Sequence, residues 1–202
     1  DLYSYLLVPA GPGRPLLVLF HGTGGSEHQL AALGRELLPQ AGLLAPRGDV
    51  SEEGAARFFR RTGEGVYDMD DLARATAKMA AFVRASAAAE RPSSLLGLGY
   101  SNGANVLASV LFAEPGLFDA AVLMHPLIPF EPVIEEGRLK SRVLITAGRH
   151  DPICPPALTA RLEAWLRAKG ADVALEWHEG GHDLRQNEVA AARAFLAPYG
   201  GG

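Results

Sequence analysis

The sequence lacks several features that mark particular classes of protein. It contains a single cysteine, Cys154, so no internal disulfide can form, which agrees with a reducing compartment. Its apolar runs extend over about five residues, far below the ~20 that cross a bilayer. The net charge of −4 provides no basic surface for nucleic acid. These absences exclude a disulfide-stapled, membrane-spanning or nucleic-acid-binding protein.

The N-terminal residues contain no basic segment followed by an apolar one, which is the pattern of a signal peptide. We therefore expect a cytoplasmic protein. With 48% hydrophobic and 21% charged residues, the 202-residue chain can bury a substantial core. The length and composition predict one globular domain over residues 1–202.

Short apolar runs predict the strands of a central sheet. Five runs are uninterrupted, as is typical of parallel strands covered by helices on both faces: Leu16 to Phe20, Leu43 to Ala45, Leu95 to Leu98, Ala120 to Met124 and Val143 to Ala147. Tyr3 to Val8 is a further expected strand. Apolar and polar residues alternate from Val173 to His178, so this strand is expected near a sheet edge.

Helical spacing of apolar residues separates these runs. The expected helices are Asp70 to Ser86 after an Asp68 cap, Asn105 to Phe112, Pro156 to about Gly170, and about Asn187 to Leu196. Because strands and helices alternate along the chain, the sequence predicts an α/β fold with a mostly parallel sheet flanked by helices.

The stretch from Leu95 to Val106 joins an apolar strand, a G-x-S-x-G turn and an apolar helix. Gly99 and Gly103 leave room where strand and helix pass close together, and Ser101 projects from the turn between them. The backbone N–H of Asn102 then lies at the helix N-terminus, where unpaired donors and the helix dipole favour negative charge. The alternative is an ordinary glycine-rich turn, but the flanking strand and helix favour a nucleophilic serine.

A serine nucleophile needs a base and an acid that orients the base. In the α/β arrangement that contains such an elbow, the three groups occur along the chain in the order serine, acid, histidine, and each lies on the turn at the carboxyl end of a strand. Asp151 follows the strand Val143 to Ala147, and His182 follows the strand Val173 to Trp177. Taken singly, Asp151 is a turn residue before proline and His182 a solvated loop histidine. Their joint placement predicts the triad Ser101, Asp151 and His182.

The loop after the first buried strand is rich in glycine: His21-Gly22-Thr23-Gly24-Gly25. Its glycines let it fold back toward the serine, so that Thr23 N–H and Asn102 N–H point at one oxygen. We expect these two amides to form the oxyanion hole. By itself the segment is a flexible turn, and it lacks the Gly-Lys-Ser/Thr ending of a phosphate loop.

The order of four motifs resembles the bacterial phospholipase/carboxylesterase family of α/β-hydrolases over nearly the whole chain: His21-Gly22-Thr23-Gly24-Gly25, Gly99-Tyr100-Ser101-Asn102-Gly103, Asp151-Pro152 and Gly181-His182. Two further segments resemble a branch that includes hydrolases linked to hydroquinone or copper stress: Ala45-Pro46-Arg47-Gly48 and Arg57-Phe58-Phe59-Arg60-Arg61. The resemblance implies an α/β-hydrolase fold and a small serine esterase without cofactor or metal, often a homodimer. Many members carry an acidic residue in place of Gly25 and Gln-Gly-Gly in place of Asn102-Gly103-Ala104, which leaves the acyl preference open.

The segment His125 to Ser141 is the one stretch available for a lid, and its three prolines disfavour a long helix. We therefore expect no cap domain and a shallow cleft bordered by Phe58, His125, Leu127 and Ile153. Such a cleft suits short-chain or small aromatic esters.

Three other interpretations are weaker. His178 and His182 have a metal-ligand spacing for a helix, but Gly180 and Gly181 lie between them. A nucleophilic cysteine would occupy the elbow, where Ser101 stands, so we expect Cys154 to be a small packed residue. Arg57, Arg60 and Arg61 could bind an anionic substrate, although solvated surface charge is more common. The expected function is a carboxylesterase; a thioesterase or lactone hydrolase with the same triad, or a non-catalytic binding module, are the alternatives.

Overall fold

The computed structural model describes residues 2–134 and 137–201. Its main sheet has the strand order β1-β3-β2-β8-β9-β10-β11. The strands are β1 (Tyr5–Val8), β2 (Leu16–Phe20), β3 (Gly42–Pro46), β8 (Leu95–Tyr100), β9 (Ala120–Met124), β10 (Arg142–Gly148) and β11 (Asp172–His178). Only β1 runs antiparallel to its neighbour, β3, so the predicted mostly parallel sheet is confirmed.

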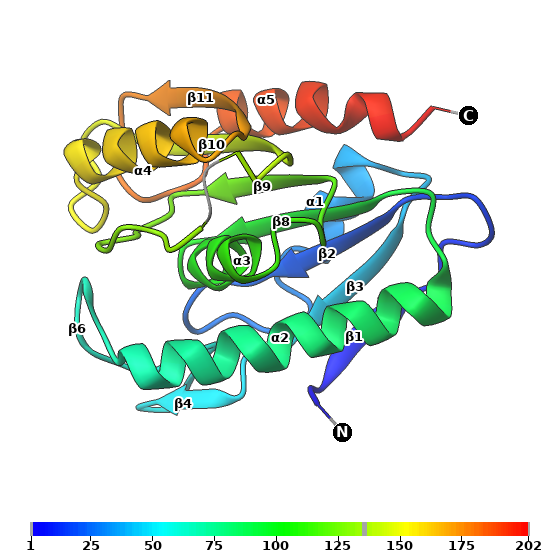
Figure 1. Ribbon diagram of the computed structural model, residues 1–202, viewed down its shortest axis with the longest axis horizontal. Coiled ribbons are helices and arrows are strands. Elements are labelled where there is room, and N and C mark those ends of the chain that lie inside the picture. Colours follow the sequence, from blue (N-terminus) through cyan, green and yellow to red (C-terminus); the bar gives the residue numbers. More distant parts are fainter. Residues whose placement is uncertain (1, 135–136, 202) are drawn as a thin grey trace.

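The expected edge strand, β11, pairs with β10 alone and ends the sheet. Figure 1 shows the arrowheads of β8, β9 and β11 pointing to the same side of the molecule. Residues that follow these strands therefore gather at one end of the sheet. That end is where the predicted functional residues lie.

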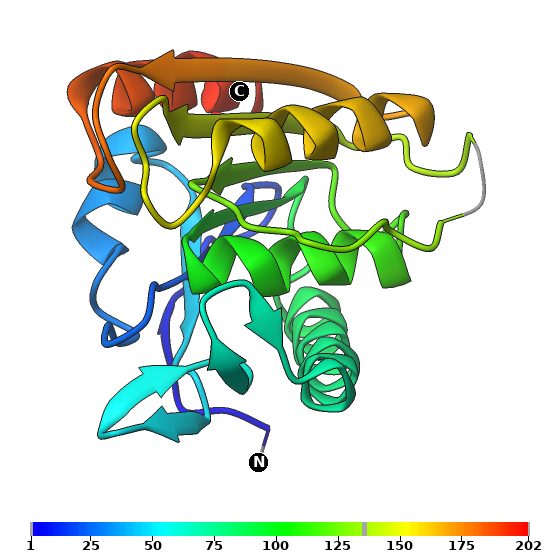
Figure 2. The same ribbon diagram turned by 90° about the vertical axis from the view of Figure 1, so that its left-hand side faces the viewer.

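Five α-helices and one short 3₁₀-helix accompany the sheet in the described part of the chain: α1 (Ala31–Leu37), α2 (Met69–Glu90), α3 (Asn102–Ala113), α4 (Pro156–Ala168), α5 (Gln186–Leu196) and η1 (Ala197–Tyr199). Buried side chains of α2, α3 and α4 pack on one face of the sheet, and those of α1 and α5 pack on the other. In Figure 2, α1 (blue) and α5 (red) lie on the left of the molecule, and α2, α3 and α4 (teal to yellow) lie toward the right. The predicted flanking helices are confirmed, and α1 is one that the sequence analysis missed.

Helix α2 begins where its cap was expected. The Asp68 carboxylate accepts the backbone N–H of Asp71 at 3.0 Å, which satisfies one of the free donors of the first turn. The helix continues to Glu90, beyond the predicted end at Ser86, because residues 87–89 are alanines, the best helix formers. It ends at Arg91, whose φ of 48° is left-handed.

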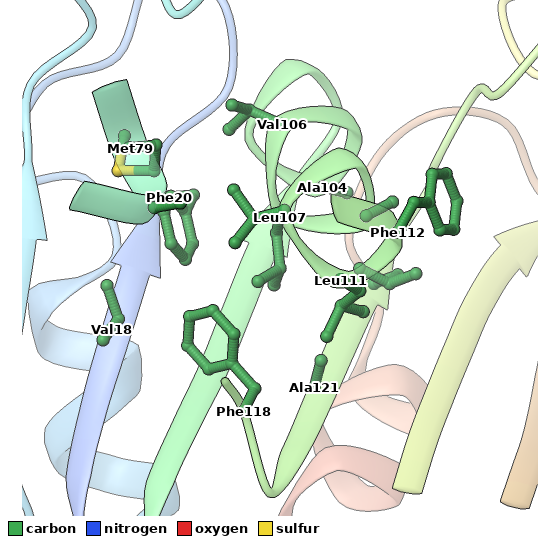
Figure 3. Packing of buried hydrophobic residues seen from close by; sticks show 14 of the residues in the cluster. Val18, Phe20, Met79, Ala104, Val106, Leu107, Leu111, Phe112, Phe118 and Ala121 are labelled. Carbon is green, nitrogen blue, oxygen red and sulfur yellow. The ribbon is translucent and has the colours of Figure 1, made fainter. Parts of the chain in front are cut away.

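Helix α3 lies against β2, β8 and β9 and determines where Ser101 points. Figure 3 shows Leu107 of α3 facing Phe118, and Leu111 next to Ala121 of β9. A Cβ at Gly97 would lie 2.8 Å from Leu107 Cδ1, so this glycine lets the helix approach β8 closely. Because α3 begins at Asn102 rather than at the predicted Asn105, no linker separates Ser101 from the helix.

Two small hairpins between β3 and α2 were not predicted: β4 (Val50–Glu52) with β5 (Ala55–Arg57), and β6 (Arg61–Gly63) with β7 (Val66–Tyr67). Strands of two or three residues leave no measurable alternation in a sequence. Figure 1 shows β4 and β6 at the end of the sheet toward which β8 and β9 point.

No cap domain is inserted between β9 and β10. The described residues of that segment, 125–134 and 137–141, contain no helix or strand, as expected from its prolines. Residues 135 and 136, which belong to the same predicted segment, lie outside the described residues. Across the described chain, no helix has both the length and the apolar character required to span a membrane.

Candidate active site

Ser101 occupies the sharp turn between β8 and α3. Its φ of 55° and ψ of −117° are strained for a residue with a side chain, which costs about 1–3 kcal/mol. The strain is imposed by close packing: a Cβ at Gly103 would lie 2.0 Å from the carbonyl oxygen of Phe20, and one at Gly99 would lie 2.7 Å from Gly103. Both glycines of the motif are therefore required by the path of the chain.

The three residues predicted as a triad lie together at the carboxyl ends of β8, β10 and β11. Ser101 Oγ is 2.8 Å from His182 Nε2, and His182 Nδ1 is 2.7 Å from Asp151 Oδ2. The other carboxylate oxygen of Asp151 accepts the backbone N–H groups of Ile153 at 2.8 Å and Cys154 at 3.0 Å. The acid is thus fixed by its own turn before it meets the histidine.

These bonds determine the protonation of the site. Burial raises the pKa of Asp151, but hydrogen bonds from His125 and His182 outweigh burial, and the net pKa is below its ordinary value. An ionised Asp151 accepts a hydrogen bond from His182 Nδ1–H, which leaves His182 Nε2 as the acceptor that faces Ser101. The serine hydroxyl therefore donates to Nε2, as proton removal requires.

The loop that carries His182 is fastened to the rest of the site. The Tyr100 hydroxyl donates to the carbonyl oxygen of His182 at 2.6 Å, and the backbone N–H of His150 donates to Gly180 at 2.9 Å. A Cβ at Gly148 would lie 2.1 Å from the carbonyl oxygen of Gly181, so the end of β10 and the histidine loop are in direct contact. The orientation of the imidazole is set by these contacts.

Thr23 lies after β2, in the glycine-rich loop. Its hydroxyl accepts a hydrogen bond from Arg57 Nη1 at 2.6 Å, and the neighbouring Gly24 N–H donates to Ala56 at 3.0 Å. Asn102 begins α3, and its side-chain oxygen accepts the Phe58 N–H at 2.8 Å. Residues 56–58 therefore brace both the loop of Thr23 and the first turn of α3, a connection that the sequence analysis did not foresee.

A small cavity of about 20 Å³ opens beside Ser101, which is roughly the space of one water. The expected Leu127 and Ile153 line it. The remaining walls are Arg57, Arg61, Gly65, Tyr67, Asn102, Asn105 and Cys154 together with Ser101 itself. The cavity is small, and the shallow cleft expected from the sequence stays a prediction.

Phe58 and His125 do not line this cavity, contrary to expectation. The Phe58 ring is fully buried and packs on Phe20 and His21, with ring centroids 6.1 and 4.6 Å apart. The apolar ring turns inward because its backbone N–H is held by Asn102. His125 is fully buried behind the triad, where its ring contacts Asp151 and Glu188.

The contact between His125 and Glu188 was missed because the two residues are far apart in the sequence. His125 Nδ1 is 2.9 Å from Asp151 Oδ2, and His125 Nε2 is 2.7 Å from Glu188 Oε1. Glu188 also accepts the Arg185 N–H at 2.8 Å, in a capping box at the start of α5. A capping role was the only sequence signal at Glu188, and it accounts for only one of its two oxygens.

Arg57 is not the solvated charge that the sequence analysis favoured. It is 2% exposed; Nε donates to the carbonyl oxygen of Phe59 at 3.1 Å and lies 3.2 Å from Glu52. Arg61 contacts the same carboxylate at 3.0 Å. Two guanidinium groups thus share one carboxylate at the cavity wall, so these three groups together carry one positive charge. Arg60 is mostly exposed and pairs with Asp71.

The structure also shows the contacts of the histidines considered as metal ligands and of Cys154. His178 Nδ1 accepts the Gly180 N–H and His178 Nε2 donates to Asp183, so this ring and His182 do not share a ligand position. Buried groups of the metal-ligating type do gather within 4.8 Å around His125, but they are hydrogen-bonded or ion-paired to one another. Cys154 is buried, its thiol donates to the carbonyl oxygen of His125, and burial raises its pKa, so it is a packed thiol.

Comparison with known proteins yields consistent similarities. A family model described as the dienelactone hydrolase family matches residues 2–194. The putative hydrolase MhqD of Bacillus subtilis (strain 168) is 40% identical over 187 residues, which cover 92% of this chain and 94% of MhqD. Protein Atu2452 of Agrobacterium tumefaciens str. C58, of unknown function, aligns with a TM-score of 0.93 and 57% identity, covering 99% of this chain and 98% of the other. A Bacillus cereus carboxylesterase aligns with a TM-score of 0.92 and 34% identity, and the alignment covers 98% of this chain and 94% of the carboxylesterase.

Proposed function

The chain belongs to the dienelactone hydrolase family, and we propose that it is a serine carboxylic-ester hydrolase for short-chain or small aromatic esters. Membership of a hydrolase family with carboxylesterase neighbours bears out the resemblance that the motifs indicated. The finer assignment is supported by one observation, the hydrogen-bonded chain from Ser101 Oγ through His182 to Asp151 at 2.8 and 2.7 Å.

In the proposed reaction, Ser101 Oγ attacks the ester carbonyl carbon while His182 Nε2 takes the hydroxyl proton. Asp151 stabilises the imidazolium that forms. The carbonyl oxygen becomes an oxyanion, which the backbone N–H groups of Thr23 and Asn102 hold. His182 then returns the proton to the leaving alcohol, and the acyl group stays on Ser101.

Deacylation repeats these steps with water as the nucleophile. His182 removes a proton from water, the hydroxide adds to the acyl carbon, and Ser101 leaves with the proton from His182. The products are a carboxylic acid and a free enzyme. Every proton is carried by His182, so the proposed cycle uses only the chain's own groups and water.

The nucleophile is tested with a fluorophosphonate probe, which labels an activated serine. We expect the wild-type protein to be labelled at Ser101, and the Ser101→Ala protein to be unlabelled and inactive toward p-nitrophenyl acetate. This experiment also addresses the alternative of a non-catalytic binding module. An unlabelled, inactive wild-type protein with correct folding by circular dichroism would refute the esterase.

A lactone hydrolase with the same triad is the second candidate, because the matching family is the one described for dienelactone hydrolase. A thioesterase is the third. The three share the attack of Ser101 on the carbonyl carbon and differ in the group that leaves during acylation: a free alcohol, a hydroxyl that stays tethered to the acyl group, or a thiol. The triad alone therefore does not separate them. Comparing kcat/KM for p-nitrophenyl acetate, a small lactone and a short acyl-CoA ranks the three directly.

Substrate size follows from the cavity. Each added methylene contributes about 0.8 kcal/mol only while it contacts an apolar wall, and the cavity of about 20 Å³ offers Leu127 and Ile153 as its aliphatic side chains. We expect kcat/KM to peak at short acyl chains of p-nitrophenyl esters. A value that keeps rising from C12 to C16 would refute the shallow site.

The charge at the cavity wall adds a preference that can be measured. Arg57 and Arg61 share Glu52 and leave one positive charge near Ser101. We expect a short ester with a carboxylate on its acyl group to react faster than its neutral isostere, and Arg61→Gln to reduce that ratio. Arg60→Gln is the matched control, because the Arg60 side chain pairs with Asp71 instead.

A homodimer, which the resemblance implies, stays a prediction.

A further inference from the structure

A second histidine lies directly behind the proposed triad. His125 follows β9 with a left-handed φ of 53°, and its backbone N–H donates to the carbonyl oxygen of Thr146 at 2.8 Å. Its ring is completely buried, and Nδ1 lies 2.9 Å from Asp151 Oδ2. That same oxygen receives His182 Nδ1 at 2.7 Å. One carboxylate oxygen therefore holds two imidazoles.

The other nitrogen of His125 faces a second buried carboxylate. Nε2 is 2.7 Å from Glu188 Oε1, and both side chains are fully buried. The same oxygen of Glu188 accepts the Thr146 hydroxyl at 2.6 Å, and Oε2 accepts the Arg185 N–H at 2.8 Å. Glu188 is thus surrounded by donors, as an ionised carboxylate in the interior must be.

His178 is the remaining histidine next to Glu188, and its hydrogen-bond partners determine which ring nitrogen carries the proton. Its Nδ1 accepts the Gly180 N–H at 2.9 Å, so the ring proton is on Nε2, 3.0 Å from the carbonyl oxygen of Asp183 and 3.2 Å from Glu188 Oε2. A neutral His178 with this tautomer satisfies every contact. It adds a donor to the cluster.

His125 therefore stands between two carboxylates that both need donors. Nδ1 and Nε2 of His125 lie 2.9 and 2.7 Å from a carboxylate oxygen, and a ring nitrogen without a proton would there point its lone pair at an anion. Burial lowers the pKa of His125, but the bonds to Glu188 and Asp151 outweigh burial and raise it. Burial likewise raises the pKa of Glu188, and the bonds from His125 and Thr146 outweigh it and lower the pKa. Both shifts favour an imidazolium between two anions.

The other titratable groups that face His125 are neutral. The Tyr100 ring lies 6.0 Å from the His125 ring, and burial raises its pKa to about 12. The Cys154 thiol donates to the carbonyl oxygen of His125, and burial raises its pKa as well. The charges around His182 are therefore one cation on His125, the anions on Asp151 and Glu188, and the neighbouring Asp183, whose pKa is lowered and which pairs with Arg185 at 3.3 Å.

The order of these charges in space matters for His182. The rings of His125 and His182 are 5.2 Å apart and share Asp151 Oδ2, whereas Glu188 Oε1 lies 2.7 Å from Nε2 on the far side of His125, an ion-pair contact by distance that does not have the geometry of a hydrogen bond. The nearer cation disfavours a second imidazolium on the same carboxylate.

We propose that His125 is a positioning residue, a second histidine that is held by Glu188, fixes Asp151 Oδ2 and sets the pH range in which His182 acts as the base. The inference rests on the proposed serine esterase. It assigns a function to a buried ion pair on β9 and α5 that the three-residue mechanism does not use.

Two variants remove the cation in different ways. His125→Asn keeps a side-chain donor near the position of Nδ1 and loses the charge. The double variant His125→Asn/Glu188→Gln also removes the carboxylate that would otherwise remain buried without its partner, so it protects the fold. Glu36→Gln, which neutralises an exposed ion pair between α1 and Arg193 of α5, is the control.

The decisive readout is the acid limb of kcat/KM against pH. Loss of a cation at this distance moves such a limb by about one pH unit, so we expect both His125 variants to need a higher pH for full activity. Their kcat should fall more than their KM changes, and Glu36→Gln should match the wild-type profile. A purely structural His125 would lower the melting temperature and leave the limb in place. An unmoved limb in the folded double variant, or a shift to lower pH, overturns the proposal.

A second readout does not depend on activity. In wild-type protein with ¹⁵N-labelled histidine, we expect both ring nitrogens of His125 to be mostly protonated at pH 6.5, the ordinary pKa of the group, and a mostly neutral His125 ring at that pH overturns the proposal. Fluorophosphonate labelling of wild-type Ser101 separates the two claims. A labelled, active wild type with an unmoved limb refutes the role of His125 alone, whereas an unlabelled wild type refutes the esterase.

Discussion

Replacing Gly103 by alanine tests the geometry of the elbow. A Cβ at this position would lie 2.0 Å from the carbonyl oxygen of Phe20 and 2.5 Å from that of His21, whereas ordinary contact begins at 3.4 Å. The obstacles are backbone atoms, which cannot rotate away as a side chain can. The first turn of α3 and the end of β2 must therefore separate by the difference, about 1.4 Å.

The displacement affects stability and activity through different atoms. Overpacking of a close contact costs about 1–3 kcal/mol, which for a domain of this size lowers the melting temperature by about 2–12 °C. The same separation moves Asn102 away from the loop of Thr23. Because a misplacement of about 1 Å costs on the order of 10²-fold, and loss of one oxyanion donor about 10²–10³-fold, we expect kcat to fall by about 10²–10³.

The assay compares Gly103→Ala with Gly116→Ala. A Cβ at Gly116 meets no atom within 4 Å, so this control adds the same methyl group without a contact. Both proteins are measured by thermal denaturation and by hydrolysis of p-nitrophenyl acetate. If Gly103→Ala keeps the melting temperature and the kcat of Gly116→Ala, the strand and helix do not pass as closely as argued, and the reasoning on the elbow is refuted.

Two further predictions concern the charged groups. Asp151→Asn should reduce turnover of p-nitrophenyl acetate by up to about 10⁴, because an amide favours the wrong tautomer of His182; near-normal turnover would assign the acid elsewhere. The stability from the pair His125 and Glu188 should depend on pH in both directions. The Glu188 pKa is lowered from 4.5, so its contribution is complete above that value and lost as the pH falls through the lowered pKa. The His125 pKa is raised from 6.5, so its contribution is complete below that value and lost as the pH rises through the raised pKa. The melting temperature of wild type minus that of His125→Asn/Glu188→Gln should therefore be largest between pH 4.5 and 6.5, and a difference independent of pH would contradict the paired charges.

Local patterns in the sequence determined the architecture and the three residues that meet at its end. The uninterrupted run from Leu16 to Phe20 could only be a strand buried on both faces, and it forms β2 with the predicted bounds. Ser101, Asp151 and His182 could be selected because each directly follows a strand. Parallel strands bring all their carboxyl ends to one edge of a sheet, so position along the chain was sufficient to place them together.

The tertiary structure alone decided what surrounds those three residues. Phe58 is apolar and Arg57 is charged, yet both are buried. The Phe58 N–H donates to Asn102 and the Arg57 guanidinium donates to Thr23, hydrogen bonds that span 44 and 34 positions of the sequence. His125 and Glu188 meet from β9 and α5 without any shared motif. Periodicity reports which face of an element is apolar, whereas the partner of a buried polar group depends on how separate elements pack. Hydrogen bonds and ion pairs between distant segments leave no period in a sequence, which is why the protonation of this site is visible only in the folded chain.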